Sequence, residues 1–145
     1  MRVFSSRPAI AALAFATLIG AVLPAFAEIT AYKADLKSST EVPPNDSKAT
    51  GMVETIYDSA TKKLVWIVTY SGLTGAATAA HFHGPADATA TAPPVVPISG
   101  ALASPFKGEA MLTDAQAADF TAGKWYFNVH TAAHKDGEIR GQLKK

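Results

Sequence analysis

The amino-acid sequence predicts an all-β protein, a β-sandwich or Greek-key barrel of about eight short strands with one short helix. Three observations lead to this fold class. Stretches of alternating apolar and polar residues, rich in β-branched and aromatic side chains, recur along the chain. Clusters of Gly, Pro, Ser, Asn and Asp separate these stretches, as expected for turns between strands. Only one stretch combines good helix formers with capping residues.

The first half of the chain contains four of the expected strands. The first strand alternates, and we expect Ile29, Ala31 and Leu36 to face inward. A turn-rich connection with two prolines leads to the second strand, and "SATKK" forms a hairpin turn into "LVWIVTY", a run typical of a central strand. These four strands are expected at residues 28–36, 51–58, 64–70 and 77–83.

The second half begins with a long loop and contains the helix. The loop at 84–100 is rich in Ala, Thr and Pro, and its prolines argue against a central strand there. The segment at 113–123 predicts a helix that Thr113 or Asp114 caps and Gly123 ends. The remaining strands are expected at residues 106–112, 124–131 and 137–143.

The N-terminal segment has the features of a secretory signal peptide. Arg2 and Arg7 precede an apolar run, and "AFA" completes a small-x-small cleavage signature at Ala27. The apolar run is too short for a comfortable membrane span, and an uncleaved anchor is the alternative reading. We therefore expect a cleaved signal peptide at residues 1–27, a single domain at 28–145, and export to the periplasm or to the medium.

The composition of the expected mature domain limits its partners. The whole chain has 13 basic and 12 acidic residues, so removing the two arginines of the signal peptide leaves 11 against 12, a net charge of −1. This balance indicates neither nucleic acid nor an acidic membrane surface, and no second apolar run long enough for a membrane span follows. The chain has no cysteine, so a metal site must use nitrogen and oxygen donors. Met52 and Met111 are expected in the core rather than as ligands.

The four histidines of the chain occur in two short stretches, "AHFHGPA" and "NVHTAAH". His81 and His83 flank Phe82, so on a strand both imidazoles lie on one face and the phenyl ring on the other. His130 lies on the polar face of its own strand together with Asn128. If the two strands are neighbours, three imidazoles converge, and imidazole is the commonest neutral metal ligand at about pH 7. The alternative is structural, with each imidazole bonding loop carbonyls at a strand end.

Further side chains could complete or support such a site. His134 is a further candidate ligand, although we favour exposure of its ring on the turn "AAHKDG". Asn128 and Glu138 are expected to orient ring N–H groups as outer partners of the ligands. Glu138 also shares a strand face with Arg140, and here we prefer an ion pair at the strand end, which fixes the C-terminal strand, over a catalytic carboxylate.

Three stretches together carry a family resemblance: "AAHFHGPA", "LTDAQAADFTAGKWYFNVHT" and "GEIRGQL". In this order they resemble the CHRD domain, the module named after chordin, over nearly all of the expected mature chain. The resemblance implies an immunoglobulin-like β-barrel, loosely similar to copper/zinc superoxide dismutase, in a small secreted bacterial protein. The recurring histidines of the family correspond to His81, His83 and His130. His134 stands where many members carry Asn or another residue.

Three functions are compatible with these patterns. We favour a secreted or periplasmic metal-binding protein that uses His81, His83 and His130, with copper as the first choice of metal and zinc as the alternative. A metal-free module could instead present the Pro-rich loop at 91–97 to a protein partner or a surface polymer. An enzyme, such as a superoxide dismutase-like copper protein, ranks last, because no bridging histidine or other catalytic motif is evident. A second chain could complete the site, so a dimer is possible.

Overall fold

The computed structural model describes residues 27–145, so the expected signal peptide lies outside the described residues except for Ala27. The described part contains eight strands, one α-helix and one short 3₁₀ helix. Their bounds are β1 Ile29–Lys37, η1 Ser38–Thr40, β2 Thr50–Asp58, β3 Lys63–Ser71, β4 Ala77–His83, β5 Pro94–Pro97, β6 Phe106–Met111, α1 Asp114–Thr121, β7 Tyr126–Thr131 and β8 Ile139–Gln142. The expected all-β fold with one short helix is confirmed.

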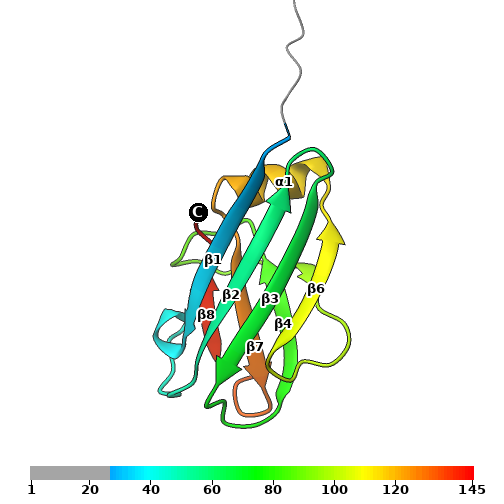
Figure 1. Ribbon diagram of the computed structural model, residues 1–145. Helices are drawn as coiled ribbons and strands as arrows, with labels where there is room; N and C mark the ends of the chain where they lie inside the picture. Colours follow the sequence, from blue (N-terminus) through cyan, green and yellow to red (C-terminus); the bar gives the residue numbers. More distant parts are fainter. Residues whose placement is uncertain (1–26) are drawn as a thin grey trace, which may run out of the picture.

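The strands form one antiparallel sheet that curls into a nearly closed barrel. Their order is β5-β4-β7-β8-β1-β2-β3-β6. Figure 1 shows β1, β2, β3 and β6 as one layer in front of β8, β7 and β4. Strands β4 and β7 are neighbours in this order although the whole of β5, β6 and α1 lies between them in the chain. This pairing brings the two histidine-bearing segments together.

The core fills the space between the two layers and is strongly aromatic. Phe82 is fully buried, and its ring centre lies 4.8 Å from that of Phe127, 5.1 Å from that of Trp66 and 6.0 Å from that of Trp125. The inward side chains alternate with outward ones along each strand, as the strand period of two requires. Phe82 therefore anchors β4 in the core, and its two histidine neighbours point to the other face.

Several side chains lie on the face opposite to the one expected. Leu36 is buried as expected, but Ile29 is 62% exposed and Ala31 is also exposed. Leu36 and Ile29 have opposite parity on β1, so a regular strand cannot bury both. Met52 and Met111, expected in the core, are 36% and 64% exposed, because each lies on the outward parity of its strand.

The Pro-rich loop contains the one strand that the sequence did not predict. Strand β5 pairs with β4 alone and forms one edge of the sheet. An edge strand needs hydrogen bonds on one side only, so prolines are tolerated there. The expectation that the prolines exclude a central strand agrees with this position.

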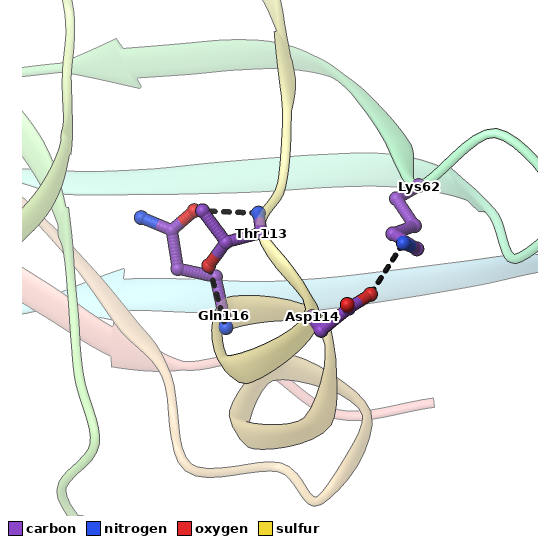
Figure 2. Close-up of polar contacts among 4 residues, drawn as sticks. All are labelled: Lys62, Thr113, Asp114 and Gln116. Atoms are coloured by element: carbon purple, nitrogen blue, oxygen red, sulfur yellow. Dashed lines mark hydrogen bonds and ion pairs between the residues drawn. The ribbon is translucent and has the colours of Figure 1, made fainter.

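Helix α1 closes one end of the barrel (Figure 1). Thr113 caps the helix, because its hydroxyl accepts a hydrogen bond from the backbone N–H of Gln116, while the side-chain oxygen of Gln116 accepts one from the backbone N–H of Thr113 (Figure 2). Asp114 forms an ion pair with Lys62 of the β2–β3 turn (Figure 2). The buried ring of Phe120 packs on the core rings of Tyr32, Tyr57 and Trp125. Within residues 27–145, no helix is long and apolar enough to cross a membrane.

Candidate metal centre

The register between β4 and β7 brings three histidines to one place on the outer face of the sheet. His81 lies opposite Asn128, and His130 lies two residues further along β7, opposite Ala79 beside a bulge in β4. His81, His83 and His130 each offer one ring nitrogen, and these nitrogens all lie within 4.8 Å of one another. The expected convergence of the three imidazoles is therefore confirmed.

Two of the rings are held in place by backbone carbonyl groups. The Nδ1 atom of His83 lies 2.8 Å from the carbonyl oxygen of Ala92, and that of His130 lies 2.8 Å from the carbonyl oxygen of Lys135. A carbonyl oxygen can only accept, so Nδ1 carries the proton in both rings, and in each neutral ring Nε2 carries the lone pair. Metal-binding histidines are typically oriented in this way, with the second nitrogen donating to a backbone carbonyl.

His81 completes the group through a contact with His130. Its Nδ1 lies 3.1 Å from Nε2 of His130. Since Nε2 of His130 carries a lone pair, His81 must donate the proton of this hydrogen bond. An ion held by both nitrogens would take the place of that proton, and His81 would carry its proton on Nε2 instead.

The surroundings keep the rings of His81 and His83 neutral. Burial lowers the pKa of the His81 imidazole, and the neighbouring His130 and His83 add to this effect. Burial also lowers the pKa of His83, although its hydrogen bonds to Ala92 and Asn128 act in the opposite direction. Both rings are therefore neutral at neutral pH, with one ring proton each, and the neutral ring has the lone pair that can bind a metal ion.

A stack of planar groups supports His83. Its ring lies parallel to that of Tyr126, with 4.7 Å between the ring centres, and the guanidinium carbon of Arg140 lies 3.5 Å from the centre of the Tyr126 ring. Arg140 is 1% exposed and donates to the carbonyl groups of Asp87 and Ala90. These bonds hold the loop after β4, whose Ala92 carbonyl orients His83.

This supporting role of Arg140 is not evident from the sequence, which suggested Glu138 as its partner. The expected ion pair between them is wrong, because no such pair occurs among the described residues and the Arg140 guanidinium donates to the loop after β4. Tyr126 has the same strand parity as Asn128 and His130, and from this parity the sequence indicates either stacking near the site or exposure to solvent; the structure shows the stacked position.

The other predicted residues have different positions. Asn128 reaches the cluster, with its amide oxygen 3.0 Å from Nε2 of His83. Glu138 does not orient a histidine: it accepts hydrogen bonds from Ser47, Thr74 and Thr131, because its side chain lies beneath the loops that carry the first two of these residues. His134 lies in the turn after β7, outside the group of three histidines.

The donor set fits a metal ion that prefers imidazole. Ligand nitrogens bind zinc at about 2.0–2.1 Å, so two nitrogens on one such ion lie at most about 4 Å apart. The contact between His81 and His130 already satisfies this limit, and His83 needs only a small inward movement. The three rings leave at least one coordination position open for water or another ligand.

The fold and this cluster define a class: a small antiparallel β-barrel domain with three histidines on the outer face of two neighbouring strands. Residues 32–143 match the family model of the CHRD domain, so the chain belongs to the CHRD domain family. This confirms the resemblance carried by the histidine and "GEIRGQL" motifs. The searches of curated proteins and of solved structures returned no match.

Proposed function

We propose that this protein binds one metal ion through His81, His83 and His130. One observation carries the proposal. Backbone carbonyls fix the proton of His83 and His130 on Nδ1 and so leave a lone pair on Nε2 of each neutral ring; Nε2 of His130 lies 3.1 Å from Nδ1 of His81, and one nitrogen of each of the three rings lies within 4.8 Å of the others. A purely structural histidine needs no such convergence. When bound, the ion would supply an open coordination position suited to carriage of the metal or to exchange of a small ligand.

Copper is the metal we propose, with zinc as the alternative. The three donors are all imidazole nitrogens, and divalent copper has the highest affinity for such sites among the divalent first-row metals. Residues 1–27 have the pattern of an export signal, and we propose a periplasmic or secreted location, where the site would meet external copper.

Calorimetric titration with copper and zinc tests the proposal. We expect one-to-one binding by the wild-type protein and no specific binding by the variant that combines His81→Ala, His83→Ala and His130→Ala, because all three donors are then missing. His134→Ala is the matched control, since it removes a histidine of the same motif outside the cluster, and it should bind within about two-fold of the wild type. Circular dichroism must show that each variant is folded. Equal, weak binding by all of them would refute the proposal.

A second candidate is a metal-free interaction module. The outer face of β2 and β3 supports it, because four large apolar side chains there are at least 36% exposed: Met52, Ile56, Val65 and Ile67. For such a module, replacing the three clustered histidines by Gln should leave binding to a partner intact. Partner binding that falls in this variant and depends on copper in the wild type would contradict it.

A further inference from the structure

A row of buried polar groups extends from His83 away from the other two histidines. The Asn128 amide is the first of them, 3.0 Å from the ring of His83. The carboxyl of Glu41 follows; this residue comes directly after η1 and is 5% exposed. Its Oε1 atom has no hydrogen-bond partner within residues 27–145. A buried polar atom without a partner is rare and requires an explanation.

Gly137 shows how close Glu41 and Asn128 lie to each other. A Cβ atom at position 137 would overlap Oε1 of Glu41 and would come within 2.9 Å of Nδ2 of Asn128. The carboxyl and the amide therefore lie side by side against the same piece of backbone. Gly137 has φ 131°, a conformation that other residues rarely adopt. Because glycine has no Cβ atom, the space beside this backbone is free for the side chains of Glu41 and Asn128.

The hydrogen bonds of His83 determine which way the Asn128 amide must point. In the structure the amide oxygen of Asn128 faces Nε2, so both ring nitrogens of His83 face acceptors, which suits only a doubly protonated ring. The neutral ring carries a lone pair on Nε2 and requires a donor there. A half-turn of the amide exchanges its oxygen and nitrogen, presents N–H to Nε2 and turns Oδ1 toward Glu41. Oδ1 is then satisfied only if the carboxyl donates a proton.

We propose that Glu41 is a positioning residue of the histidine cluster: its protonated carboxyl donates to Oδ1 of Asn128 and thereby holds the Asn128 N–H against Nε2 of His83 in the metal-free protein. The orphaned carboxyl oxygen, the space left by Gly137 and the hydrogen-bond requirements of His83 all agree with this arrangement. In this arrangement Nε2 of His83, Oδ1 of Asn128 and the protonated oxygen of Glu41 each have a partner of the correct kind.

The groups around Glu41 keep the protonated form populated. The pKa of Glu41 is raised to about 7: burial raises it most and Asp136 adds to this, while Arg140, the backbone N–H of Val42 and the Asn128 amide in its unturned orientation lower it. A small surface hollow borders Glu41, and its titratable lining residues are His134, Lys135 and Asp136. Protons from the solvent have a short path to the carboxyl through this hollow.

The arrangement has a consequence for metal binding, and this consequence rests on the proposed function. An ion that binds Nε2 of His83 must displace the Asn128 N–H. Glu41 therefore stabilises the metal-free state and lowers the metal affinity by the contribution of one hydrogen bond, about three- to ten-fold. Glu41→Gln keeps a donor toward Asn128, whereas Glu41→Leu has similar size and no donor.

Nitrogen NMR of the metal-free protein tests the inference without any metal. In the wild type we expect the Asn128 side-chain amide signals to change during a pH titration with a midpoint of about 7. In Glu41→Gln these signals should keep their low-pH position throughout, and in Glu41→Leu that position should be lost. The inference would be overturned if the Asn128 signals of both variants matched those of the wild type. It would also be overturned if the signals of Glu41→Gln changed with pH at the same midpoint as in the wild type. If Glu41→Leu does not fold, the comparison of wild type with Glu41→Gln still decides.

Copper titration provides the second measurement and separates the two proposals. We expect Glu41→Leu to bind copper about three- to ten-fold more tightly than the wild type, and Glu41→Gln to stay within about two-fold at pH values where Glu41 is protonated. If copper binding depends on the three histidines but Glu41→Leu binds copper as tightly as the wild type or more weakly, the result contradicts the role of Glu41 and leaves the proposed function intact. Failure of every protein to bind either copper or zinc refutes the proposed function, whereas the Asn128 signals still decide the role of Glu41.

Discussion

Glu138→Ala is expected to lower the free energy of unfolding at pH 7 by about 4 kcal/mol or more. The carboxylate of Glu138 is fully buried and accepts four hydrogen bonds: from the Ser47 hydroxyl at 2.6 Å, the Thr74 amide at 2.8 Å, the Thr74 hydroxyl at 2.7 Å and the Thr131 hydroxyl at 2.6 Å. Each hydrogen bond to a charged group contributes about 1.5–3 kcal/mol, and alanine leaves all four donors without their acceptor. Urea denaturation followed by circular dichroism measures the loss.

Two variants give this prediction its controls. Glu138→Gln keeps one acceptor oxygen, so it should lose about half as much stability as Glu138→Ala. Glu54→Ala removes an exposed glutamate from β2 and should change stability by no more than about 0.5 kcal/mol. A loss in Glu138→Ala as small as that in Glu54→Ala would show that the buried carboxylate does not hold the loops.

The contribution of Glu138 should also depend on pH in a defined direction. Burial by itself would raise the pKa of Glu138, but the hydrogen bonds from Ser47, Thr131 and Thr74 together hold it below the ordinary value of 4.5. For an acid with a lowered pKa, the stabilisation is present above the unfolded pKa and is lost as the pH falls through the folded value. The advantage of the wild type over Glu138→Gln should therefore shrink below pH 4.5. An advantage that stays constant down to the acid transition would contradict this assignment.

Phe82→Ala is the second substitution with a large expected effect. We expect a loss of about 3–5 kcal/mol in the free energy of unfolding, because the ring is fully buried between Trp66, Trp125 and Phe127 and its removal leaves a cavity. The substitution should also weaken metal binding in the folded fraction, since Phe82 is the inward anchor between His81 and His83. Urea denaturation and copper titration on the same samples measure both effects.

Phe82→Leu is the matched control for the core. Leucine refills most of the space, so it should lose clearly less stability than alanine and keep the metal affinity. If Phe82→Ala weakened metal binding no more than Phe82→Leu, the histidine positions would not depend on this anchor. Stability of Phe82→Ala within about 0.5 kcal/mol of the wild type would contradict the aromatic packing itself.

Much of the fold could be predicted because strand periodicity is a local property. The alternation in "ATAAHFH" places Phe82 on one face and His81 and His83 on the other in any strand. Likewise, Thr113 followed by Gln116 forms a capping box from residues three positions apart. These relations involve near neighbours in the chain, so no tertiary contact is needed to establish them.

Parity alone does not say which face of a strand is turned inward. Met52 and Val53 are both apolar neighbours on β2, yet Val53 is buried and Met52 is 36% exposed. Packing of the two layers decides between the faces, because the inward face is the one that meets the opposite layer. Strand β5 was missed for a related reason: its prolines are compatible with a strand only at a sheet edge, and the order of strands is a tertiary property.

The sequence by itself determined the family motifs, the strands that carry them, and the grouping of His81 with His83 on one face. Only the tertiary structure decided that β4 lies beside β7, which adds His130 to the group, and that His134 remains outside it. It also decided that Glu41 lies buried behind Asn128 and that Arg140 holds the loop after β4. Local backbone geometry fixes which side chains share a face, whereas contacts between distant segments depend on how the whole sheet closes.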